Sequence, residues 1–522
     1  METITNSLQR IIPREANGKI LKPYQGAFNN LGGGNRAAPP IPVSRPARIS
    51  KQTKLCKDIR EAIEKSGLAN GDTISFHHHL RNGDAVVNLV MNEIAAMGFK
   101  DLILAPSALF PVHQPLIELI EQGVIRRIEG SMNGPIGKFV SLGGMLPDIP
   151  ILRSHGGRAR AIEDGDLHID VAFIAAPTAD DYGNAYGSLG KSACGPLAYS
   201  HIDSIYADQV VVITDNLVAY PCIPHSIPAT HVDWVVNIDQ IGDADKIVSG
   251  TTRITKSPTR LLIAKYAVEI IEKSGLLKPG FSFQTGAGGI SLAVTKYLGE
   301  LMAEKNITAS FITGGITKYA VDLLHQGLVG SLFDVQVFDT ASIQSLHEDP
   351  AHWETPVTYY ANYHSKGCLV DRQDIGFLGA TEVDIDFNVN VNTHSDGYLL
   401  HGIGGHLDVA AGVNLSMILI PSYRKRIPVI RDSVTTVTAP GETIDAIVTE
   451  QGISFNPSTE MGRILNENLK NSNLPVMSIS ELKRKVENIT GIPQAPQLSD
   501  EIIALIEYRD GTIIDAVRKV IP

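Results

Sequence analysis

Two glycine-rich segments have the composition expected of backbone that binds an anion. The first runs from Gln284 to Gly289 (QTGAGG), between an expected strand at 281–283 and an expected helix at 290–300. The second runs from Gly402 to Asp408 (GIGGHLD), after an apolar stretch. Glycines let backbone N–H groups approach a ligand closely, and such groups stabilise an oxyanion. Taken alone, either segment also fits an ordinary tight turn. Neither has the spacing of a dinucleotide-binding loop or a P-loop.

An acidic segment follows the first glycine loop in the chain, at 381–388 (TEVDIDFN). In a regular strand, alternation places Glu382, Asp384 and Asp386 on one face. Carboxylates at that spacing repel one another, which a purely structural strand would avoid. One of them could act as a nucleophile or a general base. The alternative is a solvated acidic edge strand, and three oxygens without a histidine cluster are a weak metal site.

Arginines and histidines gather in two segments of the first half of the chain. One is His77-His78-His79-Leu-Arg81, and the other runs from Arg153 to Arg160 (RSHGGRAR). The arginine side chain is a planar fork that grips a carboxylate through two hydrogen bonds. Arg81, Arg153 and Arg158 are therefore candidates for binding a substrate with several carboxylates. The three histidines are no convincing metal site, because adjacent residues in a strand point to opposite faces.

The elements that position these residues alternate between short apolar strands and amphipathic helices. Alternation of this kind predicts α/β layers with a largely parallel sheet. The strands are expected at 73–77, 102–105, 171–176 and 210–214, and the helices at 54–66, 84–97 and 115–122. The first 50 residues, with the glycine run in 28–35 and the prolines of 37–46, predict an irregular arm.

An internal repeat divides the rest of the chain. Residues 71–125 and 279–329 share the order strand, turn, helix, strand, helix, and the second helix of each ends in Gln-Gly. A shift of 204 residues also pairs Asp180 with Asp384 and Thr178 with Glu382. The sequence thus predicts two similar open α/β domains, at 51–255 and 256–522, after the arm at 1–50. Sites in such pairs lie in the cleft between them, at the carboxyl ends of the strands.

Composition excludes several classes of function. The 522 residues carry a formal net charge of −11, with no long basic tract, so binding to nucleic acid or anionic membranes is not expected. No apolar run approaches the length of a transmembrane helix, and no signal peptide is visible. The four cysteines are too scattered for a disulfide framework or a zinc site. We expect a cytoplasmic protein.

Several long stretches resemble the α subunits of bacterial citrate lyase, which transfer acyl groups between citrate and an acyl carrier protein. The resemblance runs from about residue 50 to the C-terminus. The stretches that carry it are TISFHHHLRNGD (73–84), HGGRARAIEDGDLHIDVAFIAAPTAD (155–180), SACGPLAY (192–199), IVSGTTRITK (247–256), FSFQTGAGG (281–289) and GATEVDIDFNVNVNTHSDG (379–397). The order of FQTGAGG, TEVDIDFNVN and GIGGHLD is also similar to that in acyl-CoA transferases of the acetate type.

The resemblance implies a CoA-transferase-like internal duplication, and it also implies roles for the candidate site residues. Glu382 falls on the position of a glutamate that attacks the thioester, or alternatively only orients the acceptor. Gly404 and Gly405 would form the oxyanion site, while Gly286, Gly288, Gly289 and Gly402 would bind the thioester carrier. Citrate would bind to Arg81, Arg153 and Arg158. Val409 stands where those transferases have Phe, and the citrate lyase subunits are placed in a class that works through a ternary complex.

The resemblance also implies partners and alternatives. The reaction is acetyl-S-carrier plus citrate giving citryl-S-carrier plus acetate. The thiol belongs to acyl-CoA or to a phosphoribosyl-dephospho-CoA group on the γ subunit, and the β subunit cleaves the product. No metal is required. The alternatives are a stand-alone acyl-CoA:carboxylate CoA-transferase or hydrolase, a citramalate lyase α subunit, and a scaffold subunit without turnover.

Overall fold

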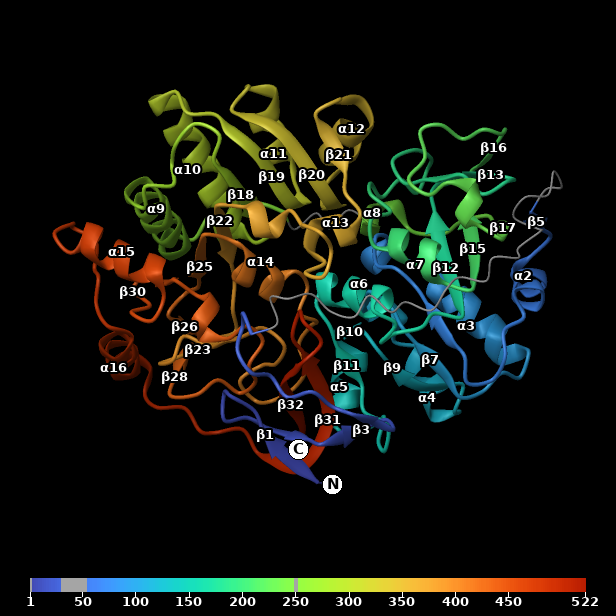
Figure 1. The fold of residues 1–522 in the computed structure, drawn as a ribbon, viewed down its shortest axis with the longest axis horizontal. Coiled ribbons are helices and arrows are strands. Elements are labelled where there is room, and N and C mark those ends of the chain that lie inside the picture. The colour runs from blue at the N-terminus through green and yellow to red at the C-terminus, as the bar shows by residue number, and fades with distance from the viewer. Residues whose placement is uncertain (1, 30–53, 248–251) are drawn as a thin grey trace.

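The computed structural model describes residues 2–29, 54–247 and 252–522, and shows two α/β halves side by side (Figure 1). The glycine and proline runs of the expected arm, and residues 248–251 of the stretch 247–256, lie outside the described residues. In the described part of the chain, no helix combines the length and apolar character needed to cross a bilayer.

The first half is built on a seven-stranded sheet in which every strand pairs in parallel with its neighbours. The strand order is β5-β17-β15-β12-β6-β7-β9. The strands are β5 (Leu55–Cys56), β6 (Thr73–Ser75), β7 (Leu102–Leu104), β9 (Ile125–Ile128), β12 (Val171–Ala176), β15 (Gln209–Thr214) and β17 (Trp234–Asn237). The helices are α2 (Ile59–Ser66), α3 (Val86–Ala96), α4 (Leu116–Glu121), α5 (Pro135–Ser141), α6 (His155–Glu163), α7 (Ser200–Tyr206) and α8 (Ala244–Ile247).

The second half is built on an eight-stranded sheet of order β21-β20-β19-β18-β22-β25-β29-β30, in which only the β29–β30 pair is antiparallel. The strands are β18 (Ser282–Thr285), β19 (Ala309–Ile316), β20 (Val329–Val337), β21 (His352–Glu354), β22 (Ile375–Leu378), β25 (Leu415–Leu419), β29 (Ala446–Val448) and β30 (Ile453–Phe455). The helices are α9 (Pro258–Lys273), α10 (Gly289–Lys305), α11 (Lys318–His325), α12 (Thr340–Glu348), α13 (Val357–Ala361), α14 (His406–Gly412), α15 (Glu460–Leu469) and α16 (Ile479–Thr490).

Six strands follow one order in both halves. The series β9-β7-β6-β12-β15-β17 in the first sheet corresponds to β20-β19-β18-β22-β25-β29 in the second. Each half also has a small three-stranded sheet. One contains β14 (Ala185–Tyr186), β13 (Thr178–Asp180) and β16 (Leu217–Val218), and the other contains β24 (Val389–Asn390), β23 (Glu382–Asp384) and β28 (Ile430–Arg431). The expected mixed α/β fold with parallel sheets is therefore confirmed.

Segments at both ends of the chain pack across the domain boundary that was expected near residue 255. The C-terminal hairpin of β31 (Leu498–Glu507) and β32 (Ile513–Val520) pairs with β11 (Ile151–Leu152) of the first half. The N-terminal segment lies beside this hairpin (Figure 1), and the ring centroids of Tyr24 and Tyr508 are 5.0 Å apart. One cluster of buried apolar side chains contains residues of both halves. The halves therefore share a core, which fixes the surfaces that face the site.

Two expected elements differ from those observed. The helix expected at 54–66 begins only at Ile59, because the Asp58 carboxylate accepts a hydrogen bond from the Glu61 N–H and caps the helix there. Leu55 and Cys56 instead form the edge strand β5. The described part of the N-terminal arm is also more ordered than expected, with two short hairpins, β1 (Thr3–Thr5) with β2 (Ile11–Pro13) and β3 (Glu15–Ala16) with β4 (Lys19–Ile20).

Candidate active site

A cavity of about 470 Å³ lies at the carboxyl ends of the strands of the second sheet. Its wall includes Thr285 at the end of β18, Gly314 and Gly315 in β19, and Leu378 at the end of β22. The first half supplies His155, from the start of α6, and Tyr199, the residue before α7. The cavity is therefore completed only when the two halves come together.

The first glycine loop lines this cavity with Gly286, Gly288 and Gly289. Gly288 caps α10, so the first N–H groups of that 17-residue helix have no partner within the helix and carry its positive dipole end. A Cβ at Gly288 would contact no other atom within 4 Å. Beside the loop, Oε1 of the buried Gln284 has no hydrogen-bond partner among the described residues. The loop thus offers donors and an open approach to an anionic or carbonyl oxygen.

The second glycine loop approaches the same cavity at Gly405, the residue that caps α14. A Cβ at Gly405 would lie 3.1 Å from the Tyr360 hydroxyl, so a side chain there would narrow the site. Gly404 has a φ of 64°, and its carbonyl accepts a 2.9 Å hydrogen bond from the His155 N–H. Gly402 is not in the cavity wall; a Cβ there would lie 1.6 Å from the Ser131 hydroxyl. Close packing against the first half requires that glycine.

Glu382 is buried and is not among the residues that line the cavity. Its side chain is 1% exposed, and one carboxylate oxygen accepts a 3.2 Å hydrogen bond from Nε of Arg431. The other oxygen accepts hydrogen bonds from the Asn390 amide at 3.0 Å and the Thr435 N–H at 2.9 Å. Burial acts to raise the pKa of Glu382, but these hydrogen bonds outweigh it and hold the pKa below its usual range. The cavity wall includes Leu378, Gly379 and Ala380 but not Glu382.

A regular strand over 381–388, which would place Glu382, Asp384 and Asp386 on one face, is not what the structure has. β23 ends at Asp384, whose carboxylate accepts hydrogen bonds from the N–H groups of Asp386 and Asn388 and closes a turn. Asp180 in the first half makes the same kind of turn with Gly183 and Asn184. Asp180 and Asp384, which the repeat pairs with each other, therefore have the same structural role of closing a turn.

Two histidines in the cavity wall were not singled out from the sequence, although both lie within quoted motifs. The ring Nε2 of His406 is 2.9 Å from the Gly379 carbonyl oxygen and donates to it, which leaves Nδ1 as a buried acceptor without a partner among the described residues. Burial lowers the pKa of His406 to about 4, and that of His155 also to about 4. Both imidazoles are therefore neutral near pH 7.

The three arginines proposed from the sequence have different surroundings. Both terminal nitrogens of the Arg158 guanidinium bind the buried Asp203 carboxylate, at 2.8 and 2.7 Å. Arg153 is paired with Glu129 at 2.7 Å and Glu507 at 3.0 Å. The carboxylates of this chain thus occupy both guanidinium groups.

Arg81 differs from the other two because, in the described part of the chain, no carboxylate forms an ion pair with its guanidinium. It stacks 4.7 Å from the centroid of the Phe338 ring, which lines the cavity, and its buried Nη1 has no acceptor among the described residues. Sequence reasoning missed Arg260 and Arg424, which do line the cavity. Neither stands in a distinctive motif, so no local pattern pointed to them.

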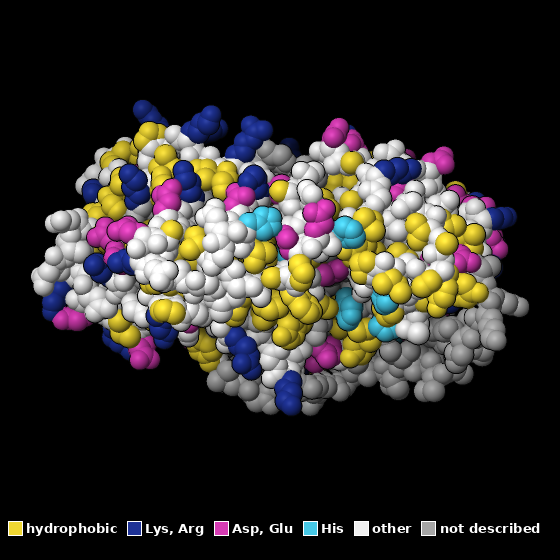
Figure 2. All heavy atoms as spheres, turned by 90° about the horizontal axis from the view of Figure 1, so that it is seen from above, with side chains coloured by type: hydrophobic (Ala, Val, Ile, Leu, Met, Phe, Trp, Pro, Cys, Tyr) yellow, Lys and Arg dark blue, Asp and Glu magenta, His cyan; other side chains and the backbone are white. Residues whose placement is uncertain are grey.

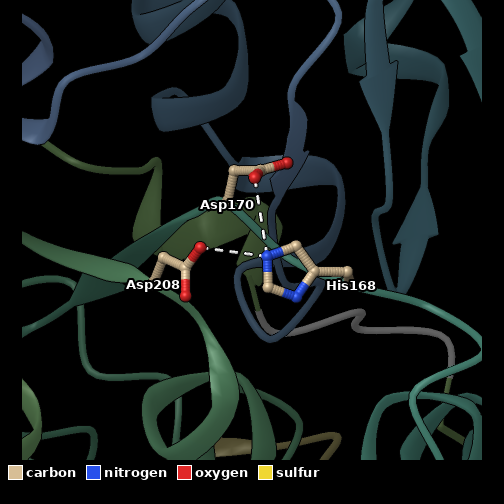
Figure 3. A group of neighbouring side chains, drawn as sticks. All are labelled: His168, Asp170 and Asp208. Carbon is tan, nitrogen blue, oxygen red and sulfur yellow. Dashed lines mark hydrogen bonds and ion pairs between the residues drawn. The ribbon is translucent and has the colours of Figure 1, made fainter. Parts of the chain in front are cut away.

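The histidine triplet does not converge on one point. His78 Nδ1 lies 2.7 Å from the Ser107 hydroxyl, His79 Nε2 lies 2.7 Å from the Ala175 carbonyl, and His77 faces Asp203 at 3.2 Å. A different group of possible metal ligands contains His168, Asp170 and Asp208 (Figure 3). Asp170 and Asp208 immediately precede β12 and β15, so the group lies at the amino ends of strands of the first sheet, and none of its residues lines the cavity; we assign it no part in the chemistry.

The chain has a mixed α/β fold with two largely parallel sheets, and the candidate cavity is lined by residues of both halves. The α subunit of malonate decarboxylase from Acinetobacter baumannii shares this fold, with a TM-score of 0.61 and 15% identity over 86% of this chain and 91% of that one. The site lies where parallel α/β sheets bind their ligands, at the carboxyl ends of the strands.

Within this class the chain belongs to the citrate lyase α subunit family, whose family model matches residues 52–520. It is 46% identical to the citrate lyase alpha chain of Klebsiella pneumoniae, over 90% of this chain and 92% of that protein. A crystal structure described as a citrate lyase α subunit from Streptococcus mutans, in complex with citrate, has a TM-score of 0.94. It is 47% identical and covers 99% of this chain and 100% of that one.

Proposed function

We propose that this cavity exchanges an acetyl group for a citryl group on the thiol of an acyl carrier. The substrates are a carrier-bound acetyl thioester and citrate, and the products are the citryl thioester and acetate. Free acetyl-CoA can replace the carrier. The observation that supports this most is the convergence of both glycine loops and two neutral histidines on one cavity between the halves.

The described cavity wall contains no Asp or Glu side chain. A carboxylate must nevertheless attack the thioester, because the carrier thiol leaves the acetyl group and joins the citryl group, and the released acetate takes an oxygen from the acceptor acid. We infer that citrate itself is this nucleophile. Its carboxylate oxygen attacks the acetyl carbonyl, the C–S bond breaks, and an acetyl–citryl anhydride and a thiolate form. The thiolate then attacks the citryl carbonyl of the anhydride, the C–O bond breaks, and acetate leaves.

Each attack passes through a tetrahedral oxyanion, which needs hydrogen-bond donors aimed at it. We propose that the N–H groups at the start of α10 and at Gly405 supply them, each with an effect of about 3 kcal/mol in a site shielded from water. The neutral histidines add no charge that would hold the thiolate as an ion pair. We propose that Arg81 binds a citrate carboxylate, because its Nη1 has no partner and no carboxylate among the described residues pairs with its guanidinium, unlike those of Arg153 and Arg158.

The family also implies an assembly. We propose that a β subunit cleaves the citryl thioester and that a γ subunit carries the phosphoribosyl-dephospho-CoA group whose thiol enters this cavity. The cavity is suited to such an arm, because Gly286 and Gly288 leave the approach free of side chains. No step of the transfer needs a metal.

The test is an acyl-exchange assay on the purified chain. Acetyl-CoA and citrate are mixed with the protein, and citryl-CoA is measured by mass spectrometry, with citramalate and succinate as alternative acceptors. We expect citryl-CoA and an equal amount of acetate, with citrate preferred. A protein that binds carrier and β subunit but forms no citryl thioester, with either acetyl-CoA or the acetylated carrier, would contradict the proposal and leave a scaffold role.

A further inference from the structure

A basic hairpin adjoins the mouth of the active-site cavity. The strands β26 (Tyr423–Arg424) and β27 (Ile427–Pro428) present three successive cations, Arg424, Lys425 and Arg426, and all three side chains are exposed. Lys425 has a φ of 55°, as expected at the tip of a tight hairpin. Within the described residues, none of the three forms an ion pair with a carboxylate. The cluster is thus unneutralised in a chain whose net charge is −11.

The hairpin forms one side of a second cavity, of about 770 Å³. Arg424 lines both this groove and the active-site cavity. Its guanidinium also donates a hydrogen bond to the carbonyl oxygen of Ala380, a residue of the active-site wall. The groove therefore continues outward from the place where acyl transfer is proposed.

The residues that line the groove have a net positive charge when acidic and basic side chains are both counted. Asp396 is the one carboxylate in the described groove wall, against Arg424, Lys425, Arg426 and Arg431. Two nearby acids already have partners: Glu382 binds Arg431, and Asp432 binds Lys483 at 2.9 Å. Arg260 adds a further exposed cation at the active-site mouth. On the face seen from above, Lys and Arg side chains gather mainly over the left half (Figure 2), where Figure 1 places the second half of the chain.

We propose that this groove binds the phosphate groups of the thioester carrier, a proposal that rests on the proposed function. A CoA-type arm has its thiol at one end and its phosphates at the other, so a transfer site needs a basic region at a distance from the glycine loops. Arginine forks and lysine ammonium groups are the side chains that bind phosphates. The shared ligand is the diphosphate linked to a nucleotide, whether it belongs to free CoA or to a prosthetic group on a carrier protein.

Citrate does not fit the groove as well, because its carboxylate must reach the thioester carbonyl beside the glycine loops. The wall of the groove contains no part of either loop. A carboxylate bound there would not contact the loops that we propose to hold the reacting atoms, whereas a remote phosphate is suited to that position. The hairpin would then contribute to thioester affinity and leave the chemical step unchanged.

The test compares thioesters with and without phosphates. A double variant, Lys425→Glu with Arg426→Glu, is assayed with acetyl-CoA and with S-acetyl-pantetheine, which has no phosphate. We expect KM for acetyl-CoA to rise at least tenfold, while kcat and the KM for S-acetyl-pantetheine change less than twofold. The control is Lys138→Glu with Lys366→Glu, which makes the same change in charge at exposed residues that line neither cavity. The control is expected to leave both KM values within twofold.

The outcomes separate this inference from the proposed function. Transfer by the wild type together with an unchanged KM for acetyl-CoA in the double variant would overturn the phosphate groove alone. An equal rise for both thioesters would overturn it as well, because the effect would not depend on phosphate. A rise confined to the intact acylated carrier protein, and absent with acetyl-CoA, would assign the hairpin to the carrier's protein surface instead. No transfer by the wild type with any thioester would overturn the proposed function itself.

Discussion

The carboxylate of Glu382 and the guanidinium of Arg431 form an ion pair inside the small sheet of the second half, with 3.2 Å between Nε and Oε1. Glu382 lies in β23 and Arg431 lies in the adjacent strand β28, so the ion pair is part of the internal packing of this sheet. A nucleophile must face its substrate, and this carboxylate faces three donors of its own chain. The geometry favours the ternary route over a glutamyl intermediate, and the nucleophile role of Glu382 stays a prediction to be tested.

Replacing Glu382 should therefore affect stability more than chemistry. Glu382→Ala leaves the Arg431 guanidinium without its carboxylate, which should lower the free energy of unfolding by roughly 2–4 kcal/mol. Glu382→Gln should lose less, and its rate of transfer per folded molecule should stay within about threefold of the wild type. Urea denaturation and the citryl-CoA assay measure the two effects. Trapping the wild type with hydroxylamine and finding a modified Glu382 peptide would falsify this view.

Gly286→Ala should impair binding of the thioester without disturbing the fold. The added methyl group would contact only the Ser291 side chain, at an ordinary 3.6 Å from its hydroxyl, and would otherwise project into the cavity. We expect the free energy of unfolding to change by less than about 1 kcal/mol, and KM for acetyl-CoA to rise about tenfold.

The matched control is Gly367→Ala, whose added methyl group would lie 3.8 Å from the nearest atom, on Arg372, in a position that lines neither cavity. It should leave both stability and KM unchanged. Equal kinetics for the two variants would show that the first glycine loop does not contact the thioester.

Arg81 and Arg158 should respond differently to the same substitution. Arg81→Gln removes a guanidinium with an unpartnered Nη1 beside the cavity, so we expect KM for citrate to rise about tenfold with little change in melting temperature. Arg158→Gln leaves the buried Asp203 carboxylate without its main partner and should lower stability by roughly 3–5 kcal/mol. Thermal denaturation and citrate titration of both variants check this. A normal KM in Arg81→Gln would remove Arg81 from citrate binding.

Asp408 should make stability depend on pH. Its carboxylate is 0% exposed and accepts hydrogen bonds from the Ser154 hydroxyl at 2.9 Å and the Gly156 N–H at 3.0 Å. Burial raises the pKa of Asp408 from 3.8 to about 6. The folded state holds this proton more tightly than the unfolded state. Ionisation of Asp408 therefore lowers the free energy of unfolding, and this loss is absent below about pH 4 and complete above about pH 6.

Asp408→Asn removes the ionisation and therefore the penalty. The stability of the variant relative to the wild type should rise between pH 4 and pH 7, by up to about 3 kcal/mol. Lost hydrogen bonds shift the difference by a constant amount, so the slope against pH is the quantity to measure, by urea denaturation across that range. A difference that does not change with pH would contradict the raised pKa.

Local features of the sequence determined the α/β class and the place of the glycine loops. A buried strand followed by glycines and a helix depends on neighbours in the chain, so β18, the loop at Gly286–Gly289 and α10 could be predicted from the order of residue types. The same holds for the strand β12, which has the predicted bounds. Family membership also follows from the sequence, because long stretches are shared.

Only the tertiary structure decided which charged side chains remain available. Arg158 and Asp203 are 45 residues apart in the chain, and Arg153 and Glu507 are 354 apart, yet each pair is in contact. Whether a guanidinium or carboxylate faces a substrate or another residue depends on such distant partners, which no local pattern encodes. For the same reason His155 of the first half and Gly405 of the second form one wall only after the two halves pack together.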